Sequence, residues 1–252
     1  MKIAFVAFSL SLALVLAFHP AAAFDGSFLG RNGLWRVVHN VCAPVSKVTG
    51  LPLPCLAVDR DKGFATVSAP GDDAHIVVTP LNRVVGVESP VLLQPDAQNY
   101  WADAWSQREW VAKGAGRALG WNDFAMAINS RPARTQDQLH IHVACIRPDV
   151  RKAADEAARL HGDKGGWFNV DLRPLGLERY RARLLKSDDL DRNIFALVAS
   201  DIPRARDYMA LQTIALIGYD EAPFGRGFIL LDNSYGAAAE ALLDPDCNMA
   251  EG

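Results

Sequence analysis

The segment from Gln138 to Ile146 alternates with a period of two between side chains of different character. One set is apolar, namely Leu139, Ile141, Val143 and Cys145, and the other is polar, namely Gln138, His140 and His142. An extended strand places every second residue on the same face, so this pattern predicts a β-strand with one buried apolar face. The two histidines then lie about 6.6–7 Å apart along one rigid strand. The chain must therefore build a sheet around a strand that carries a histidine pair.

The surroundings of this strand are basic, although the chain as a whole is acidic. Four arginines and two aspartates lie between Asn129 and Arg151, which gives 4 − 2 = +2, against a formal charge of −3 for the whole chain. Arginine binds phosphate in a bidentate manner, and histidine supplies a nucleophile or a proton. The segment therefore predicts a site for a phosphate or diphosphate substrate. We expect Arg131, Arg134 and Gln136 to contact it because of their charge and proximity.

A zinc site is the alternative interpretation of two histidines at this spacing. It requires a third ligand, and His75, His39 and His161 are candidates by residue type alone. The arginine-rich loop before the histidines favours an anionic substrate over a metal cation. We therefore expect no metal and no other cofactor.

The overall composition limits the class of protein. The 252 residues are 50% hydrophobic, which is typical of a globular chain with a real core. With 26 basic and 29 acidic residues, the chain lacks the basic excess that non-specific nucleic-acid binding requires. Nucleic acid is therefore not expected as a partner.

The N-terminus has the pattern of a targeting segment. An uncharged apolar run, Ile3 to Phe18, follows Lys2 and precedes three alanines that end at Ala23. We expect residues 1–23 to be a signal peptide that is cleaved after Ala23, with an uncleaved membrane anchor as the alternative, because sixteen helical residues span only about 24 Å. Residues 24–252 then form the mature domain.

Four cysteines lie outside this segment, an even number that suits disulfides in an oxidising compartment. Three pairings are possible. We expect Cys42–Cys55, which flank a proline-rich loop, and Cys145–Cys247, which tie the C-terminus to the middle of the chain; the other two pairings remain open.

The remaining patterns predict an α+β fold with a largely antiparallel sheet and flanking helices. The expected strands are 64–68, 74–79, 124–129, 167–172, 209–218 and 228–231, and the expected helices are 34–42, a helix capped by Asp96 that runs to Gly114, 149–160 and 188–200. Tryptophans 101 and 105 recur at helical spacing and are expected in the core.

The order of hairpin, helix and strand, with Asn129 nine residues before Gln138, resembles the histidine-triad superfamily, whose motif is His-φ-His-φ-His-φ-φ at a nucleotide phosphate site. Gln138 stands where the first histidine of that motif would be. With this departure, the segments 127–131, 134–136 and 145–151 are similar to the CDP-diacylglycerol diphosphatase (pyrophosphatase) family. The similarity extends to the four cysteines, the N-terminal apolar segment and the Glu88-Ser89-Pro90 loop.

The resemblance implies a histidine-triad-like fold, with a motif-bearing half at about 24–150 and a second half at about 151–252. It also implies hydrolysis of CDP-diacylglycerol to CMP and phosphatidate, in phospholipid metabolism, at the periplasmic side of a bacterial inner membrane. By position, His140 is the nucleophile that holds the cytidylyl group and His142 contacts phosphate or assists proton transfer. Gln138 orients the site by hydrogen bonding, and Asn129 and Thr135 match phosphate-binding positions.

Three alternatives stay open. The same covalent enzyme is a cytidylyl transferase if its acceptor is not water. It is a metal-dependent phosphohydrolase if His140 and His142 are ligands. A non-catalytic nucleotide- or lipid-binding protein is the third possibility. For the enzyme, the expected partners are CDP-diacylglycerol and a membrane surface.

Overall fold

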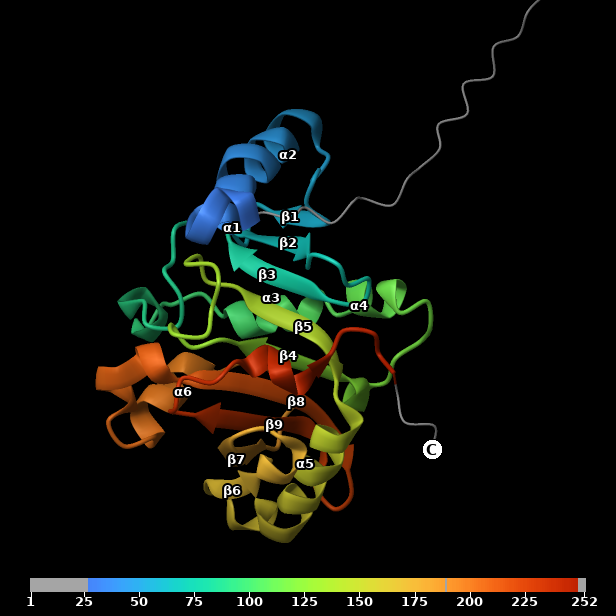
Figure 1. Ribbon diagram of the computed structural model, residues 1–252, viewed down its shortest axis with the longest axis vertical. Coiled ribbons are helices and arrows are strands. Elements are labelled where there is room, and N and C mark those ends of the chain that lie inside the picture. Colours follow the sequence, from blue (N-terminus) through green and yellow to red (C-terminus); the bar gives the residue numbers. More distant parts are fainter. Residues whose placement is uncertain (1–26, 189, 249–252) are drawn as a thin grey trace, which may run out of the picture.

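The computed structural model describes residues 27–188 and 190–248, so the expected targeting segment 1–23 lies outside the described residues. The described chain forms one large antiparallel sheet of ten strands in the order β1-β2-β3-β5-β4-β8-β9-β7-β6, with β10 paired to the end of β5 (Figure 1). The strands are β1 (Ala57–Asp59), β2 (Phe64–Ser68), β3 (Ile76–Pro80), β4 (Phe124–Ile128), β5 (Ile141–Ile146), β6 (Phe168–Asp171), β7 (Arg179–Leu185), β8 (Thr213–Glu221), β9 (Gly225–Asn233) and β10 (Leu243–Asp244). The expected α+β class with a mainly antiparallel sheet is confirmed.

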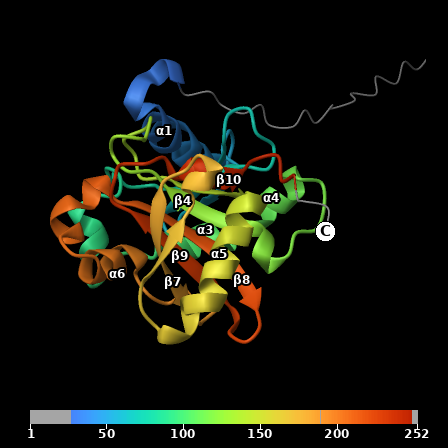
Figure 2. The ribbon, with the colours of Figure 1, turned by 60° about the horizontal axis from the view of Figure 1, so that its bottom comes forward.

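Helices cover both faces of this sheet (Figure 2). The α-helices are α1 (Gly33–Val37), α2 (Ala43–Thr49), α3 (Tyr100–Ser106), α4 (Glu109–Gly114), α5 (Pro148–His161) and α6 (Ile194–Asp201). Shorter helical segments are η1 (Ser27–Asn32), η2 (Val38–Cys42), η3 (Pro90–Leu93), η4 (Trp121–Asp123), η5 (Gly162–Lys164), η6 (Arg173–Leu175), η7 (Ala205–Leu211) and η8 (Ala239–Leu242). Together α1, η2 and α2 form one continuous helical run from Gly33 to Thr49.

The alternation of β5 separates two cores. Ile141, Val143 and Cys145 face a large core that contains side chains of α3, α4 and α6, including Trp101 and Trp105 as expected. Ala144 and Ile146 belong to the core on the other face, where α5 packs. The run from α1 to α2 covers the same face over β2 and β3, because Val77 pairs with His142 and packs against Val37 and Val38. His142 therefore lies on a face whose two ends are covered by α1–α2 and by α5.

The two halves of the sheet repeat one topology. In the first half, the hairpin β2–β3 leads through α3 and α4 to the hairpin β4–β5, and in the second half β6–β7 leads through α6 to β8–β9. The strand order β2-β3-β5-β4 is mirrored as β8-β9-β7-β6, and the halves join where β4 pairs with β8. β9, the counterpart of β5, contains no histidine. The second half is therefore a repeat of the fold without the histidine pair.

Several expected boundaries are wrong in informative ways. Asn99 caps α3 by accepting the Ala102 N–H, so the helix begins after Asn99 and not at Asp96. The expected single helix is also interrupted after Ser106, and in the interruption the Gln107 side chain accepts a hydrogen bond from Thr66 on β2. Further along, Met209 lies in η7, so β8 begins only at Thr213, and Asn193 caps α6 five residues after its expected start.

Two disulfides are present, and both match the expected pairing. Cys42–Cys55 closes the loop after α2, and Cys145–Cys247 ties the C-terminal segment to β5. Disulfides are typical of extracytoplasmic compartments. Among the described helices, no stretch is both long and apolar enough to cross a bilayer.

We predict that the Cys145–Cys247 disulfide contributes more stability than Cys42–Cys55. The residues of the first pair are 102 positions apart and those of the second pair 13. The loss of chain entropy in the unfolded state then corresponds to about 4–5 kcal/mol for the longer loop and about 3 kcal/mol for the shorter. Urea unfolding of the Cys145→Ala/Cys247→Ala and Cys42→Ala/Cys55→Ala proteins measures both. A larger loss in the second variant would contradict the prediction.

Candidate active site

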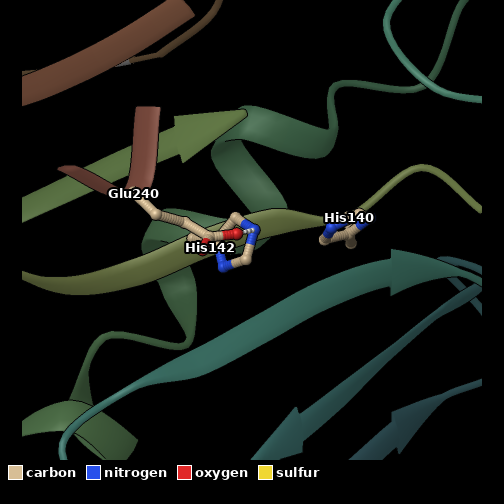
Figure 3. A group of neighbouring side chains, drawn as sticks. All are labelled: His140, His142 and Glu240. Carbon is tan, nitrogen blue, oxygen red and sulfur yellow. Dashed lines mark ion pairs between the residues drawn. The ribbon is translucent and has the colours of Figure 1, made fainter. Parts of the chain in front are cut away.

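The histidine pair of β5 lies at the centre of the sheet, between β3 and β4. His140 directly precedes β5 and His142 is its second residue, and both side chains are almost fully buried. Their ring centroids are 4.9 Å apart, and Glu240 approaches His142 from η8 (Figure 3). The strand therefore holds the two imidazoles on one face, as its alternation predicts.

The protonation state of His140 follows from its hydrogen bond. Its Nδ1 lies 2.7 Å from the backbone oxygen of Gln138, which can only accept, so Nδ1 carries the proton. Burial, followed by the charge of His142, lowers the pKa of His140 to about 4. The ring is thus neutral near pH 7, with its free lone pair on Nε2. A neutral imidazole with a lone pair on Nε2 is a competent nucleophile.

His142 lies in a row of four ionisable groups. The Asp72 carboxylate lies 3.2 Å from His75 Nδ1, His75 Nε2 lies 2.9 Å from His142 Nδ1, and His142 Nε2 lies 2.8 Å from Glu240 Oε1. The last pair is close without the alignment of a hydrogen bond, so this contact is ionic.

The two imidazoles of this row differ in their surroundings. Burial, followed by the charge of His142, lowers the pKa of His75. His142 lies between this ring and the Glu240 carboxylate, and each of them contacts one of its ring nitrogens. Of the two rings in the row, His142 is therefore the one beside a negative charge that can stabilise an added proton.

Glu240 comes from the C-terminal segment, far from the histidines in sequence. The contact with His142 is the main cause that lowers the pKa of Glu240 to about 2. Asn129, at the end of β4, donates to Glu240 Oε1 at 2.7 Å and accepts the Ala239 N–H at 2.7 Å. In this structure the Asn129 side chain thus holds η8 over the histidines.

The Gln138 side chain is fully buried and points away from the two histidine rings. Its amide nitrogen donates to the backbone oxygens of Pro80 and Asn82, and its Oε1 accepts the Val84 N–H. Both amide hydrogens are therefore used within the protein. The residue fixes the chain before β5 to the chain after β3, and its own backbone oxygen holds His140.

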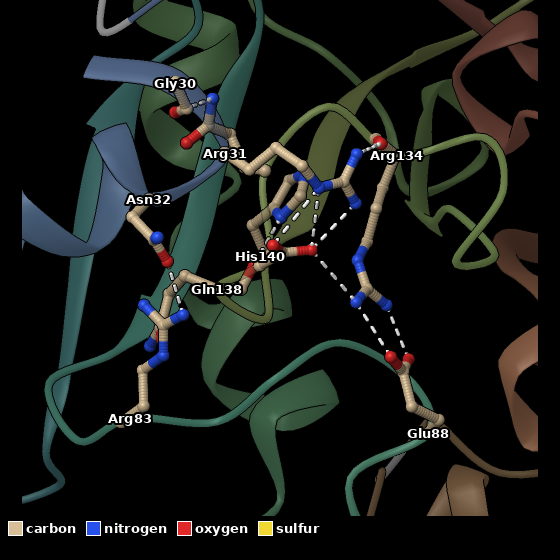
Figure 4. A network of polar contacts seen from close by, with 10 residues as sticks. Gly30, Arg31, Asn32, Arg83, Glu88, Arg134, Gln138 and His140 are labelled. Carbon is tan, nitrogen blue, oxygen red and sulfur yellow. Dashed lines mark hydrogen bonds and ion pairs between the residues drawn. The ribbon is translucent and has the colours of Figure 1, made fainter.

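A network of ion pairs holds the loop between Asn129 and β5 (Figure 4). The Arg134 side chain is only 2% exposed and forms two hydrogen bonds with Glu88, at 2.5 and 2.7 Å. Asp137 binds both Arg134 and Arg31, and these two contacts hold the pKa of Asp137 below its usual value. Arg134 is thus bound by carboxylates, close enough to His140 for its charge to help lower the pKa of that histidine.

The remaining residues expected in the site have different surroundings. Gln136 binds the N-terminal helical run, since its side chain accepts the Leu34 N–H and donates to the Gly30 oxygen. Arg131 and Thr135 are exposed, and their side chains bind no other residue that the structure describes. Both side chains are therefore available to a ligand.

Of the three candidate ligands for a zinc site, the structure brings one to the histidine pair. His75 contacts His142, whereas His39 stacks on Trp35 and His161 lies against Phe168. The sequence patterns do not predict Asp72, Glu240 or Arg31 as neighbours of the site, and they give Glu88 only as part of a loop shared with the family. No local pattern marks Glu240, but the turn that precedes His75 does contain Asp72.

Comparison with known proteins agrees with this geometry. The family model described as CDP-diacylglycerol pyrophosphatase matches residues 29–251. The chain belongs to this family. The CDP-diacylglycerol pyrophosphatase of Yersinia pestis is 30% identical over 246 residues, which cover 95% of this chain and 93% of that protein. The family is named for a hydrolase of a phosphorus-containing anhydride, the enzyme class that the resemblance implies.

We predict that His140 in this CDP-diacylglycerol pyrophosphatase family member stays neutral down to about pH 4. The pKa of His140 is lowered in the folded state and normal in the unfolded state, so between about pH 6.5 and 4 only the unfolded chain binds a proton there. The free energy of unfolding therefore falls as the pH falls from 6.5 to 4, and the contribution of His140 is complete above about pH 6.5. NMR titration of the histidine ring nitrogens measures the pKa, and His140→Asn assigns the resonance. A midpoint near 6.5 would contradict the proposed burial effect.

Proposed function

We propose that the protein hydrolyses CDP-diacylglycerol to CMP and phosphatidate through a cytidylyl group bound covalently to His140. The observation that carries this proposal is the hydrogen bond from His140 Nδ1 to the Gln138 oxygen. It leaves a neutral Nε2 lone pair on His140 beside His142, which in this proposal is protonated. A nucleophile and a proton donor side by side are what cleavage of a diphosphate requires.

In the first step, His140 Nε2 attacks the phosphorus that carries the cytidine, and a P–N bond forms as the bridging P–O bond breaks. The leaving phosphatidate takes the bond's electron pair and a proton from His142. In the second step, water attacks the same phosphorus, the P–N bond breaks, and the proton released by water returns to His142. CMP leaves and His140 is neutral again, so atoms and protons balance.

The side chains around the two rings have distinct parts in this proposal. Glu240 and His75 hold His142 in its charged form and fix its orientation, since each contacts one of its nitrogens. Arg131 and Thr135, whose side chains have no partner among the described residues, bind phosphate oxygens of the substrate. Arg134, which Glu88 and Asp137 hold, acts through its charge near His140. Asn129 and Gln136 act by positioning η8 and the N-terminal helical run.

We further propose that residues 1–23 direct the chain out of the cytoplasm and that residues 24–252 act as one catalytic domain at the periplasmic side of a bacterial inner membrane. The two disulfides support an oxidising compartment.

The first test of this function is CMP release from CDP-diacylglycerol in detergent micelles. We expect His140→Ala to lower the rate by at least about 10³-fold, because the nucleophile is removed. His161→Ala is the matched control and should keep the parent rate, since His161 ends α5 away from the histidine pair. In H₂¹⁸O, the label should enter CMP and not phosphatidate, and acid-quenched reactions should contain cytidylyl-labelled protein only when His140 is present.

Three results would contradict parts of this proposal. A folded His140→Ala protein with the parent rate excludes His140 as nucleophile. Cytidylyl-glycerol as the main product when glycerol is added identifies a transferase. Substrate binding without any CMP release by the parent identifies a binding protein.

A second prediction concerns Glu240. We expect Glu240→Gln to lower kcat about 10- to 100-fold, because the neutral amide no longer stabilises the proton on His142. The loss should shrink when the leaving phosphatidate is replaced by p-nitrophenol, which needs no proton. Glu156→Gln, on the exposed side of α5, is the control for a lost carboxylate. An equal loss with both leaving groups would contradict proton donation.

A metal-dependent mechanism is the second candidate, and one observation favours it. Ligand atoms of His140, His142 and Glu240 all lie within 4.8 Å of one another, and zinc ligands at bonds of about 2.0–2.1 Å lie about 3.3 Å apart. The His140 Nδ1 hydrogen bond also suits a metal ligand. Exhaustive chelation of divalent metals separates the two mechanisms. Unchanged turnover supports the covalent histidine, whereas loss of turnover that zinc restores identifies the two histidines as metal ligands.

A further inference from the structure

The first 32 described residues differ in charge from the rest of the chain. Residues 27–58 contain three cations, Arg31, Arg36 and Lys47, and no aspartate or glutamate, although the whole chain has more acidic than basic residues. Arg31 is paired with Asp137. Arg36 and Lys47 are exposed and form no ion pair with any residue in the described ranges. This segment therefore presents uncompensated positive charge.

The same segment also exposes apolar side chains. Val41, Val48, Leu51 and Leu53 are all exposed, Val48 to 84%, and they fall within thirteen residues. Two are on the helical run and two follow its end at Gly50, in the loop that Cys42–Cys55 closes. The disulfide and the helix hold them on one compact projection beyond the β1 edge (Figure 1). Apolar side chains gathered on an exposed projection mark a surface that binds a partner molecule or a membrane.

We propose that Arg36, Val41, Lys47, Val48, Leu51 and Leu53 form a docking surface for an anionic lipid bilayer. Cations beside exposed apolar side chains are the chemistry of an interfacial helix, in which the apolar groups enter the headgroup region and the cations bind anionic lipid. The absence of any acidic residue from 27–58 makes this surface complementary to anionic lipid over its whole length. This inference rests on the proposed function, because only a lipid substrate places the enzyme at a bilayer.

The helical run that carries this surface also contacts the loop that leads into the histidine pair. At the start of the helical run, Leu34 N donates to Gln136, and Arg31 binds Asp137 both through its side chain and through its backbone oxygen. The loop that contains Gln136 and Asp137 continues into His140. The helical run also lies on the His142 face of the sheet, since Val77, the partner of His142, packs beneath it. Docking thus places the candidate active site beside the surface from which the liponucleotide is drawn.

The direct test is hydrogen–deuterium exchange of the full chain with vesicles. We expect exchange over residues 47–53 to slow on phosphatidylglycerol vesicles and to change little on phosphatidylcholine vesicles. Arg36→Gln and Lys47→Gln should each weaken the binding to anionic vesicles about fivefold. All proteins compared carry the same residues 1–26, so differences among them report the docking surface alone.

The kinetic test uses a matched pair of variants. Leu51 and Leu160 are both 56% exposed, on the docking surface and on α5 respectively. We expect Leu51→Asp to raise KM for CDP-diacylglycerol in phosphatidylglycerol vesicles about tenfold, and Leu160→Asp to leave it unchanged. Both variants should hydrolyse monomeric dibutyryl-CDP-diacylglycerol at the parent rate, because that substrate needs no bilayer.

Several outcomes would overturn the proposal. The first is hydrogen exchange over residues 47–53 that does not slow with vesicles, or that slows equally with both lipids. The second is an equal change of KM in Leu51→Asp and Leu160→Asp. The third is a parent protein that sediments as a dimer which Leu51→Asp dissociates. The last result would make the surface an interface between two copies of this chain. If the parent releases no CMP from either substrate, the proposed function fails, while the exchange experiment still decides docking.

Discussion

The pairing of β5 with β3 and β4 determines where every group of the candidate site lies. β5 is buried between its two neighbours, and its register with β3 places Val77 opposite His142. His75 directly precedes β3 and therefore lies beside His142 on the same face, and Asn129 directly follows β4. A shift of one residue in this register would turn His140 and His142 into the opposite core, among the tryptophans of α3. The apolar residues 141, 143 and 145 prevent such a shift, because they would lose their own burial.

Around this strand, charge is arranged so that the two histidines differ. His140 donates to a backbone oxygen and its pKa is lowered by burial, whereas His142 lies between His75 and the Glu240 carboxylate. Identical side chains two residues apart thus have different surroundings, and the proposed roles of lone-pair donor and proton donor rest on that difference. The difference comes from their neighbours, which belong to the turn before β3 and to η8.

The repeated topology explains how η8 reaches the histidines. Because the second half of the sheet continues the first through β4 and β8, the chain that leaves β9 emerges beside β4. Thr213 and Ser130 both donate to the backbone oxygen of Ala237 and guide the segment toward Asn129. Cys247 then attaches its end to β5. The half without the histidine pair therefore supplies the carboxylate that contacts His142.

Local sequence patterns were sufficient for the strand with the histidine pair, the β2–β3 hairpin, helix α5 and the α+β class, because alternation, turn residues and helical spacing act over a few residues. The same reasoning failed at the start of α3, where Asn99 and not Asp96 is the cap, and at the interruption after Ser106, because several nearby residues can cap or end a helix and local spacing does not select among them. Candidate residues within the loop before β5 were visible because they are neighbours in sequence. Glu240, the ionic partner of His142, was not, because its position follows from strand order across the whole sheet. The sequence alone determined the strand that holds the histidine pair on one face, and only the tertiary structure decided which groups surround the two rings, because burial and charge depend on residues that lie far apart along the chain.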